Sequence, residues 1–243
     1  MPTDASASPF DHSPRVKLSG KKSDLAYFAL KQAIMLREYQ PGQQIREQTI
    51  AADFQCSQST VREALIHLVK DGLVKRSGYQ GTHITDTSVE EATALVHIRL
   101  SVERSLAAQL YRLKDADLTL FESLFKKMDE SHEANDIFRC SELDREFHAQ
   151  LAVVAGMEQL APILKRCALH IHRYTLGNVE VPRDFIQEAG VGDEHRVLLQ
   201  TLCEGTPELR EAALSQHLAS VLQRWAPLLY DAVGDEQFRG NTR

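Results

Sequence analysis

The chain has 243 residues, of which 43% are hydrophobic and 26% charged, shares that match average globular proteins and exclude a disordered or fibrous chain. Its net charge of −6 divides unevenly. Residues 15–85 hold eleven Lys or Arg against six Asp or Glu, a local charge of +5, whereas residues 86–243 hold seventeen against twenty-six, a local −9. The basic segment can meet the phosphates of nucleic acid, and the acidic one is repelled by them.

No stretch approaches the roughly 20 apolar residues that span a bilayer, and the start of the chain lacks the basic end and apolar run of a signal peptide. We therefore expect a cytoplasmic protein without a membrane segment. The four cysteines show no CxxC spacing, so we interpret them as small buried or half-buried side chains.

The first 86 residues predict a mobile tail followed by a small domain. Residues 1–20 are rich in Ser, Pro and Asp, and we expect a disordered tail there. Apolar spacing and turn residues then predict three helices and two strands, over residues 23–38, 47–54, 58–70, 73–76 and 82–85. The order helix, helix, turn, helix, hairpin is that of a winged helix-turn-helix domain, which we place at residues 21–86.

Beyond this domain the apolar spacing is that of helices, with Gly and Pro mainly at the breaks. We expect six helices, over residues 88–113, 115–134, 136–155, 158–176, 183–204 and 207–230, with Gly190 to Gly192 able to break the fifth. The sequence thus predicts a mainly α protein. Its winged helix-turn-helix is followed by an all-helical C-terminal ligand-binding bundle over residues 87–231 and a tail over residues 232–243.

The start of the helix at 58–70 carries short polar and basic side chains suited to DNA. The corresponding helix of a helix-turn-helix enters the major groove, where Gln suits adenine, Arg suits guanine or phosphate, and Ser or Thr suits either. A lone Arg is more simply a solvated residue, but the whole run beside a Gly-rich hairpin predicts binding to a double-stranded DNA operator. The candidate contacts are Gln48, Ser57, Gln58, Ser59, Thr60, Arg62, Lys75, Arg76 and Gly81.

The string SQSTVREALIHLVKDGLVKRSGYQGTHI resembles the signature of the GntR family of bacterial regulators. In that family V-S-R-x-P-V-R-E-A-L is followed by L-x-x-x-G-L-V and a Gly-tipped wing, and the match covers residues 51–85. Gln58 stands where the family usually has Arg, Thr60 where Pro is common, and Gln55 where Gly is usual, so the operator of relatives cannot be carried over. The resemblance implies a transcription regulator, more commonly a repressor than an activator. Because two half-sites of an operator fit two recognition helices, we also expect a homodimer.

Asp144 and His148 are four residues apart in a predicted helix, a spacing that places both side chains on one face. His195 and His217 follow in later amphipathic helices. Three imidazoles and one carboxylate suit zinc, nickel or a similar divalent ion, and leave coordination positions open for an acid. Spacing alone favours surface or satisfied core histidines, because the chain has ten of them.

The helical part resembles the FCD domain of the FadR-type GntR regulators, in which D-x-x-x-H on one helix and two later His form a metal site. This resemblance implies that the metal ligands are Asp144, His148, His195 and His217. Arg99, in the run VHIRLSVERSLAAQL, resembles the family's R-x-x-x-E segment and would bind the carboxylate of an effector. An intrahelical salt bridge to Glu103 is the alternative, and both can hold.

The implied effector is a small organic acid: a sugar acid, hydroxy acid, dicarboxylate or amino-acid derivative. At most one of His170 and His172 can face the metal pocket, since residues two apart on a helix diverge. We interpret four further histidines as ordinary residues, namely His67, His83, His97 and His132.

The main alternative function is a metal-dependent hydrolase that carries a DNA-binding module, because a His/Asp site with open positions can also activate water. The sequence contains no H-E-x-x-H, nucleophile elbow or Gly-rich phosphate loop to support it. We therefore predict a regulator and not an enzyme.

Overall fold

The computed structural model describes residues 21–113, 115–178 and 190–239. The chain divides into two compact units, Met1–Asp86 and Thr87–Arg243. The predicted tail at residues 1–20, the first seven residues of the predicted helix at 183–204 and the last four residues of the chain lie outside the described residues. Within the described ranges no helix combines the length and the apolar character needed to cross a membrane.

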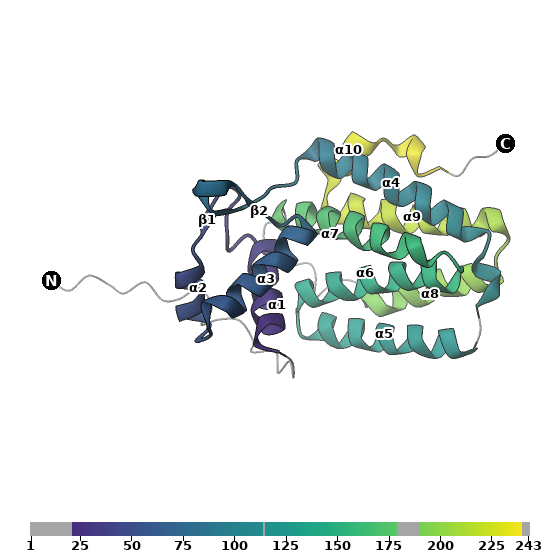
Figure 1. Ribbon diagram of the computed structural model, residues 1–243. Helices are drawn as coiled ribbons and strands as arrows, with labels where there is room; N and C mark the ends of the chain where they lie inside the picture. The colour runs from purple at the N-terminus through teal and green to yellow at the C-terminus, as the bar shows by residue number, and fades with distance from the viewer. Residues whose placement is uncertain (1–20, 114, 179–189, 240–243) are drawn as a thin grey trace. The chain divides into compact units, whose positions relative to one another are not determined.

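The described part of the N-terminal unit combines helices, which are labelled in Figure 1, with a three-stranded antiparallel sheet. The strand order in this sheet is β1-β3-β2. Its elements are α1 (Lys22–Met35), β1 (Gln44–Ile45), α2 (Glu47–Asp53), α3 (Gln58–Asp71), β2 (Val74–Arg76), the 3-10 turn η1 (Gly78–Gln80) and β3 (Thr82–Ile84). The predicted winged helix-turn-helix fold is confirmed. Strand β1 was not predicted, because a two-residue strand is too short to show an alternating pattern.

Helix α3 begins and ends where its sequence provides caps. The Ser57 hydroxyl accepts the backbone N–H of Thr60 at 3.1 Å, which satisfies one of the free donors of the first turn. Gly72 ends the helix in a left-handed conformation with φ 74°. Helix α3 packs against α1, and its buried face includes Val61 and Leu65, so the opposite face of α3 stays exposed.

In the described part of the C-terminal unit, six helices close a ring. They are α4 (Val89–Ala107), α5 (Asp115–Glu133), α6 (Ile137–Val154), α7 (Ala161–Asn178), α8 (Val191–Glu204) and α9 (Pro207–Trp225). Around the ring α4 packs on α7, α7 on α6, α6 on α5, α5 on α8, α8 on α9, and α9 on α4. The predicted all-helical bundle is confirmed, and side chains that point inward from different helices can meet.

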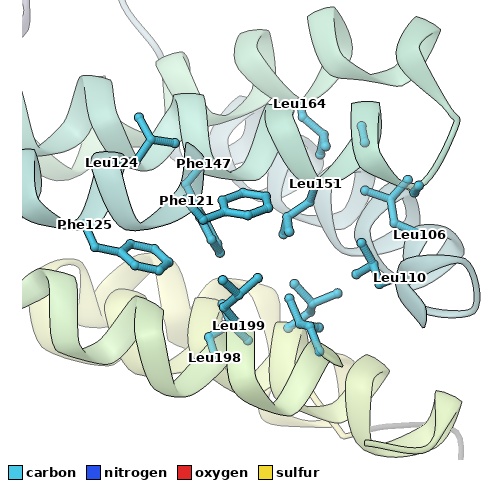
Figure 2. Packing of buried hydrophobic residues seen from close by; sticks show 14 of the residues in the cluster. Leu106, Leu110, Phe121, Leu124, Phe125, Phe147, Leu151, Leu164, Leu198 and Leu199 are labelled. Atoms are coloured by element: carbon cyan, nitrogen blue, oxygen red, sulfur yellow. The ribbon is translucent and has the colours of Figure 1, made fainter. Parts of the chain in front are cut away.

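An apolar core lies inside this ring (Figure 2). The fully buried Phe147 of α6 packs its ring 5.3 Å from that of Phe121 and 5.6 Å from that of Phe125, both of α5. Leucines of α8 cover the same cluster. The core reaches the polar interior through Phe147, whose ring centroid lies 4.9 Å from that of His195.

The C-terminal end of the described chain differs from the prediction. The helix expected over 207–230 ends at Trp225, and α10 (Pro227–Val233) follows, because a proline cannot donate the hydrogen bond that would continue a helix. The described residues of the predicted tail at 232–243 include further structure. The 3-10 turn η5 (Asp235–Gln237) brings Phe238 back to a buried position, where its ring stacks on that of Tyr230 at 5.2 Å.

The remaining short elements are η2 (Leu110–Arg112), which takes up the end of the helix predicted over 88–113, and η3 (Glu158–Leu160), which precedes α7.

Candidate metal centre and nucleic-acid interface

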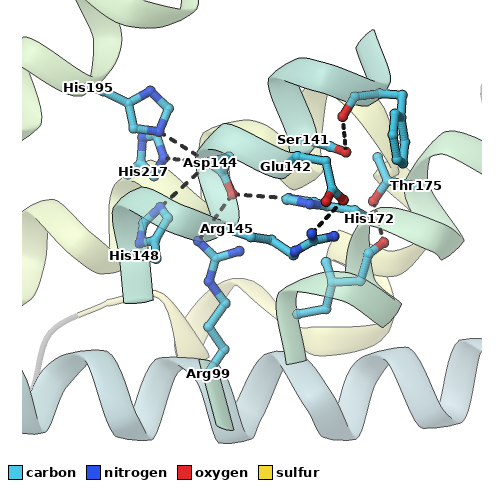
Figure 3. Close-up of polar contacts among 12 residues, drawn as sticks. Arg99, Ser141, Glu142, Asp144, Arg145, His148, His172, Thr175, His195 and His217 are labelled. Atoms are coloured by element: carbon cyan, nitrogen blue, oxygen red, sulfur yellow. Dashed lines mark hydrogen bonds and ion pairs between the residues drawn. The ribbon is translucent and has the colours of Figure 1, made fainter. Parts of the chain in front are cut away.

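Three helices bring four polar side chains together inside the ring (Figure 3). Asp144 and His148 come from α6, His195 from α8 and His217 from α9, and one donor atom of each lies within 4.8 Å of the others. Asp144 Oδ1 lies 3.1 Å from His195 Nε2, 3.6 Å from His148 Nε2 and 4.0 Å from His217 Nε2. The structure thus assembles all four residues that were predicted as ligands.

The surroundings fix how two of these imidazoles are turned. Nδ1 of His195 lies 2.7 Å from the carbonyl oxygen of Val191, and Nδ1 of His148 lies 2.9 Å from Oε1 of Glu103. Both oxygens can only accept, so Nδ1 carries a hydrogen in each ring, and a metal would bind the lone pair that Nε2 has when the ring is neutral. That nitrogen faces Asp144 in each case, which is the arrangement in which imidazoles bind metals.

The second oxygen of Asp144 has partners of its own. Oδ2 lies 3.1 Å from Nε2 of His172 on α7 and 3.9 Å from Nη2 of Arg99 on α4. The neighbouring imidazole of His170 instead lies 3.2 Å from the hydroxyl of Thr87. Only one of the α7 pair therefore contacts the cluster, as the helical spacing required.

The charge states of the cluster suit a cation. Burial would raise the pKa of Asp144, but the charge of His148 and the imidazoles around the carboxylate lower it well below the usual value. Burial lowers the pKa of His217 to about 4, although the nearby carboxylate of Asp144 opposes this shift. At neutral pH the site therefore offers an ionised carboxylate and a neutral imidazole.

Three buried nitrogen atoms of the cluster lack a hydrogen bond of regular geometry. In the part of the chain that the structure describes they are Nδ1 of His148, which is in ion-pair contact with Glu103, Nε2 of His148 and Nε2 of His217. A buried polar atom without a partner is costly and rare in folded proteins, and a ligand that accepts its lone pair removes the cost. Three imidazole nitrogens and a carboxylate oxygen are also the donors that zinc and nickel prefer, so these residues fit a divalent ion.

Arg99 and Glu103 form the ion pair that the sequence left as an alternative. Arg99 Nε donates to Glu103 Oε1 at 2.9 Å, and the two side chains are 3% and 1% exposed. Burial disfavours the charged form of each side chain, but nearby charges outweigh burial. Glu103 and Asp144 raise the pKa of Arg99, and Arg99 and His148 lower the pKa of Glu103 to about 2. Both remain charged, and Arg99 Nη2 still faces the cluster.

In the N-terminal unit the predicted DNA contacts are mainly exposed. Residues on the exposed surface of α2, α3 and β2 are Gln48, Gln58, Ser59, Arg62, Lys75 and Arg76. Sequence reasoning missed Glu47, whose Oε2 lies 2.9 Å from both Nε and Nη2 of Arg62, while its Oε1 lies 3.8 Å from Nη2 of Arg76. One carboxylate thus holds an arginine of the recognition helix near an arginine of the wing.

The other three predicted contacts have roles in the fold itself. Besides capping α3, the Ser57 hydroxyl lies 2.7 Å from that of Ser59 and 2.8 Å from that of Thr60. Gly81 has φ 85°, and a Cβ there would lie 2.9 Å from Nε2 of Gln44. These positions shape the surface, and their contact with DNA stays a prediction.

Two family models match the chain. The model of the bacterial regulatory proteins of the gntR family matches residues 22–84, and that of the FCD domain matches residues 94–220, just over half of the chain. The chain belongs to the GntR family, with an FCD domain. The protein is therefore a DNA-binding transcription regulator. The alternative of a metal-dependent hydrolase is not supported.

Similar proteins agree with this assignment. The chain is 29% identical over 187 residues to the probable D-xylose utilization operon transcriptional repressor of Paenarthrobacter nicotinovorans, covering 74% of this GntR regulator and 78% of that protein. It is 26% identical over 243 residues to the repressor NanR of Edwardsiella tarda, covering 89% of this chain and 90% of that protein. YdhC of Bacillus subtilis, an uncharacterized HTH-type regulator, is 28% identical over 60% of this chain and 66% of its own. Escherichia coli McbR/YncC shares the fold, with a TM-score of 0.64 at 18% identity over 88% of this chain and 99% of that one.

Proposed function

We propose that this regulator represses transcription as a homodimer on a two-fold symmetric operator. In this proposal a small carboxylic acid bound at a divalent metal ion controls the affinity of the protein for the operator. The observation that carries the proposal is the buried cluster of three imidazoles around Asp144, in which Nε2 of His148 and of His217 makes no hydrogen bond in the described residues. The ligands in this proposal are Asp144, His148, His195 and His217.

Zinc is the ion we expect, with nickel or another transition metal as the alternative. When bound, such an ion supplies a Lewis-acidic centre whose free positions accept a carboxylate oxygen. Arg99 supports the same carboxylate, because Glu103 occupies its Nε and leaves the terminal nitrogens of the planar guanidinium facing the cluster. With Arg99, Glu103 and Asp144 all charged, a divalent ion leaves the pocket with a net +1, which attracts an anion.

The dimer and the repressor role rest on two arguments. Helix-turn-helix proteins read paired half-sites with paired recognition helices, so a symmetric dimer fits the operator. Relatives along most of the chain are named repressors. The order of the two domains, helix-turn-helix first and all-helical second, also favours the FadR-type branch. A DNA operator as partner supports a cytoplasmic location.

Control by the acid is a matter of differential affinity. The acid can release the operator only as far as it prefers the DNA-incompetent state, and the operator must weaken acid binding by the same factor. Arg99 and the cluster lie on helices of the same ring, so a ligand held between them favours one arrangement of α4 relative to α6.

Elemental analysis tests the metal part of the proposal. We expect about one divalent ion per chain in wild-type protein reconstituted with zinc, and none in His195→Ala or His217→Ala. His170→Ala is the matched control, because it removes a buried imidazole outside the cluster, and it should retain the ion. A wild-type protein that stays free of metal after reconstitution would contradict the site.

Operator release tests the effector part. Zinc-loaded and EDTA-treated protein are compared with the same panel of sugar acids, hydroxy acids, dicarboxylates and amino-acid derivatives on a selected operator. We expect one class of acid to release DNA from the zinc-loaded protein alone. Equal release from the metal-free protein would show that the acid binds without the ion.

A further inference from the structure

Glu103 is the buried carboxylate that connects Arg99 with the metal cluster. One of its two oxygens, Oε1, accepts Nε of Arg99 at 2.9 Å and is in ion-pair contact with Nδ1 of His148, also at 2.9 Å. Arg99 is one turn away on the same helix, whereas His148 belongs to α6. The side chains of Glu103 and His148 are each 1% exposed, so water does not compete for this contact.

An ordinary helix salt bridge does not account for this arrangement. Arg–Glu pairs four residues apart are common on exposed helix faces, where each contributes only about 0.2–0.5 kcal/mol. Here both charges are buried, which costs more than the pair alone returns unless further polar partners are present. His148 is such a partner for Glu103, and it is also one of the four proposed metal ligands.

We infer that Glu103 is a positioning residue for the metal site: it holds the ring of His148 with Nδ1 turned away and Nε2 turned toward Asp144. The inference rests on the proposed metal-binding function and adds the group that prepares one ligand for it. Carboxylate partners of metal-bound histidines fix the tautomer and raise the basicity of the ring, and their loss weakens metal binding about 10- to 100-fold. Arg99 keeps the carboxylate ionised and in place.

A double-mutant cycle on the full-length protein tests the inference, with the zinc dissociation constant as the readout. We expect Glu103→Gln to weaken zinc binding about 10- to 100-fold in the wild-type background and less than about two-fold in the His148→Ala background. A merely structural role would give the same loss in both backgrounds, and that result would overturn the inference.

The control is Glu142→Gln, which removes a carboxylate from another poorly exposed Arg–Glu pair, the one between Glu142 and Arg145 on α6. It should change zinc affinity less than about two-fold. Circular dichroism of the metal-free variants checks folding, and Glu103→Asp serves as a second variant if Glu103→Gln does not fold. Asp keeps the charge but is one methylene shorter, so we expect an intermediate loss of affinity and an altered visible spectrum of the cobalt-substituted protein.

The outcomes separate this inference from the function on which it rests. Wild-type protein that binds no zinc overturns both. Wild-type protein that binds zinc, together with a Glu103→Gln variant of equal affinity, overturns only the role of Glu103.

Discussion

The carboxylate of Asp129 on α5 accepts the backbone N–H of Gly192 in the first turn of α8, with Oδ1 and N 3.0 Å apart. Its other oxygen accepts Nη1 of Arg196 at 2.9 Å. Both contacts hold the start of α8, and His195 follows Gly192 by three residues. The position of one proposed metal ligand therefore depends on a carboxylate of a different helix.

Gly192→Ala should weaken zinc binding and destabilise the C-terminal unit. At an unhindered helical position the change from Gly to Ala stabilises by about 0.5–1 kcal/mol. Here the added Cβ would lie 2.2 Å from Asp129 Oδ1, so the carboxylate must move away and its bond to the N–H is lost. We expect a net destabilisation of about 1–2 kcal/mol in urea unfolding, since a hydrogen bond to a charged group contributes about 1.5–3 kcal/mol.

The control experiment removes the carboxylate of Asp129. In an Asp129→Ala background the methyl group of Gly192→Ala has room, so the same substitution should be neutral or stabilising there. If Gly192→Ala were stabilising in the wild-type background, Asp129 would not hold the helix start in solution.

Arg62→Lys should reduce operator specificity more than general DNA affinity. Lys keeps the charge but loses the planar fork that pairs with guanine and that Glu47 holds at 2.9 Å through two nitrogens. We expect a loss of about 1–3 kcal/mol on a selected operator and little change on random duplex, measured by fluorescence anisotropy.

Lys75→Ala provides the contrast, because we expect the exposed Lys75 of the wing to contact phosphate and not bases. It should weaken binding to both duplexes and lower the slope of affinity against salt by about one. If Arg62→Lys weakened binding to operator and random DNA equally, Arg62 would contact phosphate and would not read bases.

Much of the fold follows from local signals. Apolar spacing, the cap at Ser57, Gly72 at the end of α3 and Pro207 at the start of α9 each mark an element by local chemistry. The structure at the end of the chain was not predicted, because it has no such local signal. Phe238 is held by stacking on Tyr230.

The site was predictable only in part. Asp144 and His148 share a helix face by spacing, but ten histidines look alike until the family resemblance singles out His195 and His217. Contacts between distant segments have no signal in a single sequence. The position of Glu103 against His148 depends on how α4 and α6 pack, which periodicity does not specify.

Native protein should show two unreactive thiols at pH 8. Burial, with nearby carboxylates, raises the pKa of Cys140 to about 12, and burial raises the pKa of Cys167 as well. A raised pKa leaves less of the reactive thiolate at this pH, and both sulfur atoms are also shielded from solvent. We expect iodoacetamide to label Cys56 and Cys203, which are half-buried, and to reach the other two only in urea. Peptide mass spectrometry reads this out, and equal native labelling of all four would contradict the packing of α6 and α7.

Phe147→Ala should be among the most damaging single changes in the C-terminal unit. The ring is fully buried between two other phenylalanine rings, and it packs against His148 at 5.0 Å and His195 at 4.9 Å. Removing it leaves a cavity, which costs about 3–5 kcal/mol for a buried Phe. It also removes the apolar support of two proposed ligands, so zinc affinity should fall along with stability.

Urea unfolding followed by tryptophan fluorescence measures the stability of the C-terminal unit, because Trp225 at the end of α9 is the single tryptophan of the chain. Val153→Ala is the matched control on the same helix, since Val153 is 37% exposed and its truncation should change stability by less than about 0.5 kcal/mol. A Phe147→Ala variant that loses less than about 1 kcal/mol would mean that the core relaxes around the missing ring. In that case the orientation of His148 and His195 would have to come from their polar partners, Glu103 and the Val191 carbonyl, without help from the core.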